Sequence, residues 1–388
     1  MTDTLIAPTI TDPYGPPADE MHWLERAREL AKDFATRAPA HEDASELPVE
    51  NLQILHDEGF DTALLPVEDG GGGMSMRTFG PVLAAIVEGC PSTACVWLMH
   101  VGAATTLITL GSDEMRPKWV EALRRGDRFA NALSEPSSGN MFLIPMQPGV
   151  RVEDGWTLSG AKRFVSGCET ADHFLVNASI DGMPAFFGIH HDDTLSFTPI
   201  WETMGMRATR SQLIGLDETF LPEAHMCRPP GPGDANPIGV GLPWLSLGVA
   251  DAAMAALADH AKGRVIPSTG APLSHMQWVQ FDVADAHVRL EAARLLASRC
   301  LWLGDQGSPE TIGAAIEAKL LANQVAKEVA DLGVRIGGAS GYLATSPIQR
   351  HFRNAQAGWL MAYSVEVCRD WVGKRVLDVV EGGAGGFG

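Results

Sequence analysis

Two short segments that carry hydroxyl groups are the first candidates for chemistry in this 388-residue chain. Residues 131–139 contain Ser134, which is followed by Glu and Pro, and residues 155–167 contain Ser166, which is followed by Gly. A serine on a rigid strand can donate a hydrogen bond to an electron-rich ring or to a developing oxyanion. Taken alone, each serine is more typical of a strand end, where the hydroxyl caps the backbone. Its chemistry therefore depends on the motifs around it.

Metal and disulfide chemistry is not indicated by the remaining reactive side chains. The densest group of possible metal ligands is His190-His191-Asp192-Asp193, which lies between strand-like segments and is typical of a solvated loop. The six cysteines are scattered without a C-x-x-C pair, which indicates reduced thiols in a core. We therefore expect neither a metal centre nor a disulfide framework.

The formal net charge of −19 argues against two classes of partner. Nucleic acid requires a basic footprint, and an anionic membrane surface attracts basic segments. Residues 1–20 lack the regions of a signal peptide and residues 381–388 are Gly-rich, so both ends are expected to be flexible tails. The most apolar stretch, 241–258, is interrupted by Pro243 and Asp251 and is typical of a buried helix. The expected location is the cytoplasm, with no membrane partner.

The elements that must position these residues begin with a helical region. Residues 21–128 are predicted to form an N-terminal helical domain. Apolar residues recur there at helical spacing, beginning with Leu24, Ala27, Leu30 and Phe34, as one buried helix face requires.

The pattern then changes twice, which predicts an α+β multidomain fold. Residues 129–232 are predicted to form a middle β-barrel-like domain, because alternating residues flank Asp-Gly pairs that begin at Asp154 and Asp181, a hairpin signal. Helical periods return over 233–380, and successive long helices are best buried as a C-terminal four-helix bundle. One of the apolar stripes expected in its core consists of Phe281, Ala284, Val288, Ala292 and Leu295.

Several motifs along the chain together resemble the acyl-CoA dehydrogenase superfamily. Residues 131–139 resemble its "T-E-P-x-x-G-S-D" signature, and 155–167 resemble its "G-y-x-L-N-G-x-K-x-W-I-T-N" strand pair. Residues 204–211 are similar to "M-G-x-R-x-T/S", and 337–355 to "G-G-x-G-y…P-x-x-r-x-x-R-D-A". Their order and spacing over nearly the whole chain are specific, although each motif by itself is weak.

The resemblance implies one flavin per subunit, usually FAD with FMN as the alternative, between the β-domain and the bundle of a homotetramer. In the family, the backbone at the position of Leu133 and the hydroxyl at Ser134 meet the pyrimidine edge of the ring. Phe164 replaces a Trp that lies against the isoalloxazine, and Ser166 replaces a Thr near its N5. The remaining cofactor positions that the resemblance implies are Arg264, Arg335, Gly337 and Gly338, of which Arg335 replaces a Gln.

The residue that serves as the catalytic base in most of the family is missing. Removal of an α-proton requires a carboxylate, and the family places that Glu nine residues after the Arg that matches Arg353. This position is Ala362, and the start of the first bundle helix, where some relatives carry the Glu, has no acid between 239 and 247. The nearby Tyr363 and Glu366 are the candidate substitutes. Asn140, Arg210 and Met361 are the candidate substrate-binding residues.

The vacant base position leaves three hypotheses open. The first is a dehydrogenase that acts on the CH–CH bond of an acyl thioester, linked to CoA or a carrier protein, and passes electrons to a transfer partner. The second is a two-component monooxygenase that uses O2 and flavin reduced by a flavin reductase on a small aromatic or amine substrate. Such enzymes often carry a His at the position of Met361, and it is absent here. The third is a non-catalytic member.

Overall fold

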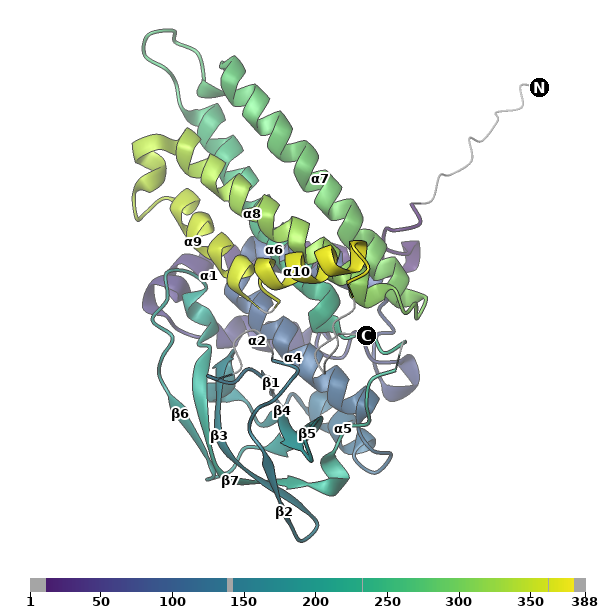
Figure 1. The fold of residues 1–388 in the computed structure, drawn as a ribbon. Helices are drawn as coiled ribbons and strands as arrows, with labels where there is room; N and C mark the ends of the chain where they lie inside the picture. The colour runs from purple at the N-terminus through teal and green to yellow at the C-terminus, as the bar shows by residue number, and fades with distance from the viewer. Residues whose placement is uncertain (1–11, 138–141, 232, 362, 380–388) are drawn as a thin grey trace, which may run out of the picture.

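The computed structural model describes residues 12–137, 142–231, 233–361 and 363–379, and Figure 1 shows their arrangement. Long helices of the C-terminal half lie at one end and the strands at the other, with the N-terminal helices between and beside them. The helical regions of both termini and the middle sheets agree with the predicted fold class. The first helices are α1 (Met21–Ala44), α2 (Val49–Asp57), α3 (Met76–Gly89), α4 (Pro91–Leu110) and α5 (Arg116–Arg125).

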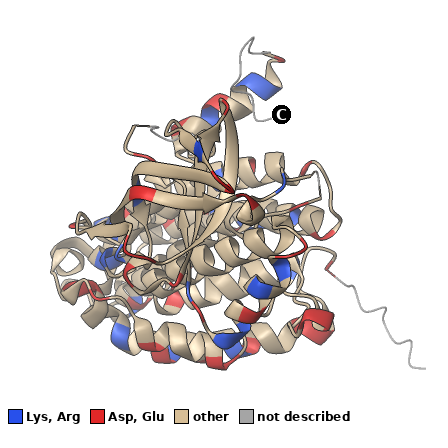
Figure 2. Cartoon of the chain, turned by 90° about the horizontal axis from the view of Figure 1, so that it is seen from below, with Lys and Arg blue, Asp and Glu red and all other residues tan. Residues whose placement is uncertain are grey.

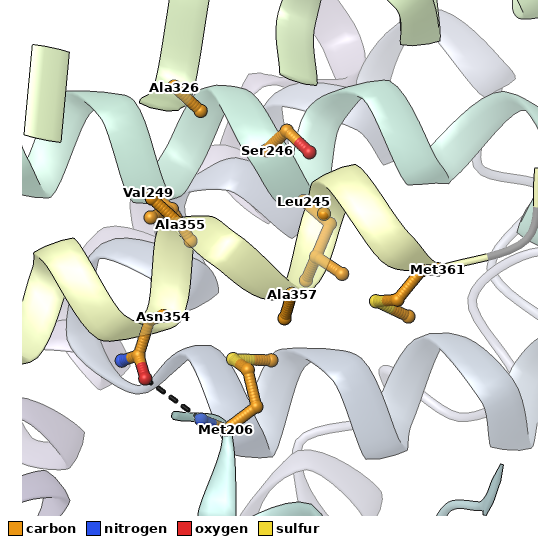
Figure 3. A pocket seen from close by; sticks show the side chains of 10 residues that line it. Met206, Leu245, Ser246, Val249, Ala326, Asn354, Ala355, Ala357 and Met361 are labelled. Atoms are coloured by element: carbon orange, nitrogen blue, oxygen red, sulfur yellow. Dashed lines mark hydrogen bonds between the residues drawn. The ribbon is translucent and has the colours of Figure 1, made fainter. Parts of the chain in front are cut away.

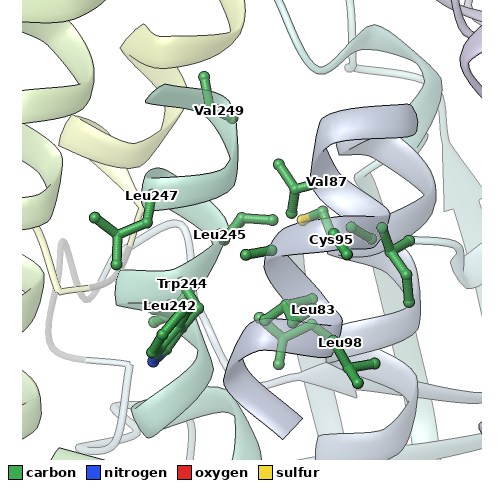
Figure 4. Close-up of a cluster of buried hydrophobic side chains, with 14 of the residues drawn as sticks. Leu83, Val87, Cys95, Leu98, Leu242, Trp244, Leu245, Leu247 and Val249 are labelled. Atoms are coloured by element: carbon green, nitrogen blue, oxygen red, sulfur yellow. The ribbon is translucent and has the colours of Figure 1, made fainter. Parts of the chain in front are cut away.

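Helix α6 (Pro237–Gly263) is the buried element that joins the N-terminal helices to the C-terminal ones. Figure 4 shows its Leu245 side chain reaching towards Val87 of α3 and Cys95 of α4. The approach to α3 is close, because a Cβ on Gly248 would lie 2.6 Å from Val87, and one on Gly80 would lie 2.6 Å from Trp244. Any larger residue at these glycines would push the helices apart.

Within the part of the chain that the structure describes, two helices, α4 and α6, are long and apolar enough to cross a membrane by length and composition. In each, 78% of the apolar window is buried inside the protein. Core helices of folded domains pass the same test, and the contacts of α6 agree with the buried helix that its sequence predicts.

The strands form two sheets, which share one core cluster. The first sheet has the order β1-β4-β5, and β1 pairs with β4 in parallel. The second has the order β2-β3-β7-β6 with antiparallel pairs. The strands are β1 (Phe129–Ala132), β2 (Gly149–Val152), β3 (Gly155–Val165), β4 (His173–Ile180), β5 (Met183–His190), β6 (Leu195–Thr198) and β7 (Gln212–Pro222).

Both predicted hairpins are present, but one turn is shifted by a residue. Ile180 pairs with Met183, so Asp181-Gly182 forms the turn, and both residues have positive φ, as this turn type requires. In the other hairpin Val152 pairs with Gly155, so the turn residues are Glu153 and Asp154, and Gly155 begins β3. A Cβ at Gly155 would lie 2.3 Å from the Leu221 carbonyl oxygen, which explains the glycine inside the strand.

The C-terminal bundle consists of α6, α7 (Gln277–Asp305), α8 (Thr311–Tyr342) and α9 (Pro347–Leu360), with α10 (Val365–Val376) packed on α8. The stripe on α7 is helical as predicted, but all five of its members are exposed and not buried in the core. Phe281, Val288 and Leu295 are 60%, 66% and 59% exposed, and their spacing of seven places them on one face. The periodicity revealed the helix, whereas the neighbours of each face depend on packing.

A buried carboxylate joins the N-terminal helices to the first strand. Asp61, which is 2% exposed, accepts a hydrogen bond from Arg128 at 2.9 Å and lies 3.2 Å from His56 Nδ1 and 3.4 Å from His100 Nε2. Burial alone would raise the pKa of this carboxyl, but His100, His56 and Arg128 together hold it well below its usual range. Figure 2 shows the other charged residues interspersed over helices and loops.

We expect Asp61→Asn to lower the free energy of unfolding by about 3 kcal/mol at neutral pH, because Arg128 then stays largely buried without its carboxylate. The depressed pKa of Asp61 stabilises the fold above the unfolded value of about 4 and stops doing so in acid, so the difference should shrink below that pH. Urea unfolding of the wild type and of Asp61→Asn measures this difference in the free energy of unfolding at each pH. Asp57→Asn, at an exposed position of α2, is the control, and an equal effect of the two substitutions would contradict the prediction.

Candidate functional site

The two hydroxyl-bearing segments lie side by side in the fold. The backbone N–H of Arg163, near the end of β3, donates a hydrogen bond of 2.8 Å to the carbonyl oxygen of Ser134, just after β1. Leu133 is buried in the core between α4, α5 and the sheet. The loop after β1 and the end of β3 therefore form one edge, although about thirty residues separate them in the sequence.

Phe164 presents an exposed aromatic ring at this edge. Its side chain is 51% exposed and its φ is +62°, an uncommon backbone conformation for an aromatic residue. The centroid of the Phe164 ring lies 5.9 Å from the centroid of the Trp201 ring and 4.9 Å from the Arg163 guanidinium. Backbone strain at an exposed aromatic ring is typical of a ligand platform. Trp201 was not identified from the sequence, because no motif there marks it.

A chain of hydroxyl groups runs behind Phe164. Ser166 Oγ lies 2.8 Å from Ser211 Oγ, which lies 2.8 Å from Thr209 Oγ1. Thr209 Oγ1 in turn donates to the Met206 carbonyl oxygen at 2.9 Å. The segment 204–211, known from the sequence only as a motif, thus fixes the orientation of Ser166. Because Thr209 uses its one proton on Met206, Ser211 donates to Thr209 and Ser166 donates to Ser211, so Ser166 can donate to a ligand only if its hydroxyl turns away from Ser211.

A fully buried ion pair anchors the loop that follows β1. Lys162 Nζ donates to Glu135 Oε1 at 2.8 Å and to the backbone and side-chain oxygens of Asn177 at 2.7 and 2.8 Å. Glu135 also accepts from the backbone N–H groups of Met146 and Gln147, on the far side of the same loop. Burial lowers the pKa of the Lys162 ammonium, although Glu135 opposes this change. The pair therefore ties both ends of the loop to the sheet.

We expect Lys162→Met to lower the free energy of unfolding by about 3–5 kcal/mol, because the buried Glu135 loses its ammonium partner. Lys118→Met is the matched control. Lys118 Nζ lies at the same 2.8 Å from Glu114, but both side chains are exposed, so its loss should be below about 0.5 kcal/mol. Denaturant midpoints and slopes of the two variants test the difference, and a small loss for Lys162→Met would count against the anchor.

A small, largely apolar cavity lies between the bundle and the β-domain. Figure 3 shows side chains of α6, α8 and α9 pointing to a common space, with Met206 approaching from the opposite side. The Met206 N–H donates to Asn354 Oδ1 at 2.9 Å, which joins the segment 204–211 to α9. Met361, at the end of α9, lines the cavity. The other lining residues are Leu245, Ser246, Val249, Ala326, Ala355, Ala357 and Gly358.

The two candidate catalytic groups lie just beyond this cavity, at the turn into α10. The Tyr363 ring is packed against Phe142 with centroids 5.0 Å apart, and burial raises the pKa of its phenol to about 12. Glu366 accepts a hydrogen bond of 3.0 Å from the Trp359 indole. The two further candidates Ala362 and Asn140 lie outside the described residues.

The other predicted ligand positions are dispersed. Arg210 has a φ of +46° and forms hydrogen bonds of 2.7 and 2.6 Å with Glu169. Arg264 caps the C-terminal end of α6, and Arg335 pairs with Asp282 on α7. Arg210 therefore lies beside the Ser166 segment, next to Ser211, whereas Arg264 and Arg335 lie at helices of the bundle. Arg210 and Arg335 are already paired with carboxylates.

The glycine pair on α8 marks a sharp change in the helix. Gly338 has a φ of +53° and a ψ of −144°, which are not helical, and nothing lies within 4 Å of where its Cβ would be. At Gly337, a Cβ would lie 2.9 Å from Ile348 Cδ1 of α9. Gly338 is therefore required by the backbone and Gly337 by the close approach of α9.

Comparisons with known proteins support the same fold. The family models "Acyl-CoA dehydrogenase, N-terminal domain" and "Acyl-CoA dehydrogenase, C-terminal domain" match residues 17–127 and 240–377. The mitochondrial short-chain specific acyl-CoA dehydrogenase of Bos taurus is 28% identical over 373 residues, which cover 90% of this chain and 89% of that protein.

Two solved structures share the architecture over almost their whole length. A chain from a study of the electron transferring flavoprotein of Acidaminococcus fermentans has a TM-score of 0.87 and 24% identity, covering 95% of this chain and 100% of that chain. FMN-bound TdsC from Paenibacillus sp. A11-2 has a TM-score of 0.82 and 21% identity, covering 92% and 97%. At these identities the likeness shows the fold alone.

Proposed function

Because this chain belongs to the acyl-CoA dehydrogenase superfamily, we propose that it is a flavin-dependent oxidoreductase acting on the CH–CH bond of an acyl thioester, linked to CoA or a carrier protein. One observation carries the proposal. The exposed Phe164 ring and the Ser166 hydroxyl chain stand at one edge of the β-domain, and a largely apolar cavity lies at the junction with the bundle.

The residues at the Phe164 edge fit an isoalloxazine ring. The exposed face of Phe164 can pack on a flat aromatic system, and the backbone at Leu133 and Ser134 together with Ser166 can donate hydrogen bonds to its polar edge. A bound flavin supplies an acceptor for the hydride that leaves the β-carbon. FAD is the proposed cofactor and FMN the alternative. Arg264, Arg335, Gly337 and Gly338 are proposed contacts for the rest of the cofactor.

Most of the lining of the cavity is aliphatic, which suits the acyl part of a thioester better than a charged ligand. Its volume of about 10 Å³ is that of one water, so the lining must move apart before an acyl chain enters. Met361 and Met206 are flexible and can adapt to the chain that enters. Asn140 and Arg210 are the other proposed substrate-binding residues.

The group that would accept the α-proton must differ from the Glu of most of the family, because Ala362 stands at that position. With a pKa of about 12, Tyr363 is a poor base at neutral pH and a better hydrogen-bond donor. Glu366 is a carboxylate, but it is exposed, and one of its oxygens accepts a hydrogen bond from the Trp359 indole. Of the two, Glu366 is the proposed base and Tyr363 the proposed donor to the substrate carbonyl.

Direct reduction of the bound flavin by an acyl-CoA tests this function. Under anaerobic conditions, and without any reductase, we expect stoichiometric bleaching of the oxidised flavin absorbance by at least one straight-chain acyl-CoA. The reason is that a thioester carbonyl acidifies the α-proton that must leave. A CoA thioether of equal chain length, which has no carbonyl, is the control and should leave the spectrum oxidised. Absence of bleaching over short, medium and long chains would sink the proposal.

The second candidate function is a two-component flavin monooxygenase that oxygenates a small aromatic or amine substrate. It is favoured by Ala at position 362, where the usual carboxylate is missing, and by the fold shared with FMN-bound TdsC. The same purified protein can be used to distinguish the two candidate functions. NADH consumption with an oxygenated product, seen only when a flavin reductase and O2 are supplied, would support this candidate.

We also propose a cytoplasmic homotetramer that passes electrons to a transfer partner, or receives them from a flavin reductase. All six cysteines are free and buried, as in a reducing compartment. The apolar face of α7, formed by Phe281, Val288 and Leu295, is the proposed subunit contact, with Trp278 47% exposed at its end. Isolated chains rarely leave such a row of large apolar side chains in water.

Negative charge introduced on the α7 face should dissociate the proposed homotetramer. We expect the double variant Val288→Glu/Leu295→Glu to sediment as a smaller species than the wild type, because two carboxylates would have to be buried at the contact. Val49→Glu is the control, since Val49 is also half exposed but lies on α2. Sedimentation velocity gives the masses, and an unchanged mass for the double variant would remove α7 from the contact.

A further inference from the structure

The hydroxyl chain behind Phe164 ends on a group that can only accept hydrogen bonds. Thr209 Oγ1 lies 2.9 Å from the carbonyl oxygen of Met206, which also accepts the Trp201 indole N–H at 2.9 Å. A carbonyl oxygen has no proton to donate, so the proton of the Thr209 hydroxyl lies on this contact. The opposite order would leave two buried oxygens 2.9 Å apart with no proton between them.

This carbonyl sets the direction of every hydrogen bond that follows. Thr209 uses its single proton on Met206, so Ser211 donates to Thr209, and Ser166 in turn donates to Ser211, each across 2.8 Å. Thr209, Ser211 and Ser166 are 1%, 3% and 8% exposed, so bulk water does not compete for these bonds. The Ser166 oxygen is therefore left with lone pairs, while its proton is already in use.

Backbone contacts on both sides of Ser166 hold this chain in place. The N–H of Gly167, directly after Ser166, donates to the Thr209 carbonyl oxygen at 3.0 Å. Val165, directly before Ser166, pairs with Gln212 of β7. The two segments that carry the hydroxyls are thus bonded to each other through their backbones. A ligand that binds at this edge meets a chain whose direction is already decided.

The Cys95 thiol of α4 also lies beside Ser166. Burial raises the pKa of this thiol to about 12, and the Ser166 hydroxyl opposes the rise. Cys95 therefore stays protonated at neutral pH, and a thiol is only a weak donor. A serine oxygen has two lone pairs, so one remains for a ligand even when the thiol uses the other.

We propose that the Met206 carbonyl makes Ser166 a hydrogen-bond acceptor toward the flavin, so that the site favours the reduced ring, which carries an N5–H, over the oxidised ring. The oxidised N5 offers only a lone pair, and Ser166 could donate to it only by giving up its bond to Ser211. Ser211 and Thr209 are thus positioning residues, which act on the flavin through Ser166. The inference rests on the proposed function, because it requires a flavin at the Phe164 edge, and deepens it by naming the preferred redox state.

The midpoint potential of the flavin in the loaded protein tests the proposal, because it shifts with the ratio of the dissociation constants of the oxidised and reduced forms. We expect Ser211→Ala to lower the preference for the reduced ring about tenfold, a fall of about 30 mV for a two-electron couple. Without Ser211, the proton of Ser166 is free to turn to the oxidised ring. Thr209→Val, which keeps the side-chain volume, should also lower the potential, because the two serines can then donate in the direction of the flavin.

Two further variants make the readout specific. Ser159→Ala is the matched control, since Ser159 also lies on β3 and its Oγ accepts the Glu218 N–H of β7 at 3.0 Å, but seven residues before Ser166. Its potential should equal that of the wild type. Ser166→Ala removes the acceptor, so its potential should fall, but oxidised flavin should not bind more tightly to it, as it should to Ser211→Ala. Ultrafiltration gives the dissociation constant of the oxidised form, and the thermal midpoint establishes that each variant is folded.

The outcomes separate this inference from the proposed function. A potential that is unchanged or higher in a folded, flavin-loaded Ser211→Ala or Thr209→Val overturns the inference, since a purely structural role would weaken the binding of both redox forms alike. Bleaching of the flavin by an acyl-CoA would still support the dehydrogenase in that case. If the protein takes up neither FAD nor FMN in either redox state, the proposed function falls, and this inference falls with it.

Discussion

The burial of α6 is the constraint on which the other parts of the structure depend. This helix contacts α3 and α4 on one side and α7, α8 and α9 on the other, so it belongs to the cores of both helical regions. Gly80 and Gly248 allow the approach to α3, where any larger side chain would meet Trp244 or Val87. Because α6 also supplies Leu245, Ser246 and Val249 to the cavity, the packing of the core sets the shape of the site.

The β-domain contributes rigid edges rather than volume. Its two sheets hold the end of β3 and the loop after β1 together, and the Glu135–Lys162 pair fixes that loop from inside. The strained backbone at Phe164 persists because the surrounding strands hold it in this conformation. An aromatic ring on a rigid strand, beside hydroxyls already hydrogen-bonded to each other, is prepared for a flat polar ligand before that ligand arrives.

Short-range patterns in the sequence were sufficient to predict the order of the secondary-structure elements and the family. Helical periods, the hairpin signals and the spacing of the serine motifs act over a few residues, so the order of helices, strands and helices could be predicted, as could the family. Tertiary structure decided the rest. Trp201 reaches the site from a distant segment and carries no local signal, and the contact of Ser211 with Ser166 does not follow from the motif that contains Ser211. The stripe at Phe281 shows which residues share a face but not what covers it. Periodicity fixes the direction of side chains, whereas their neighbours depend on how distant elements pack.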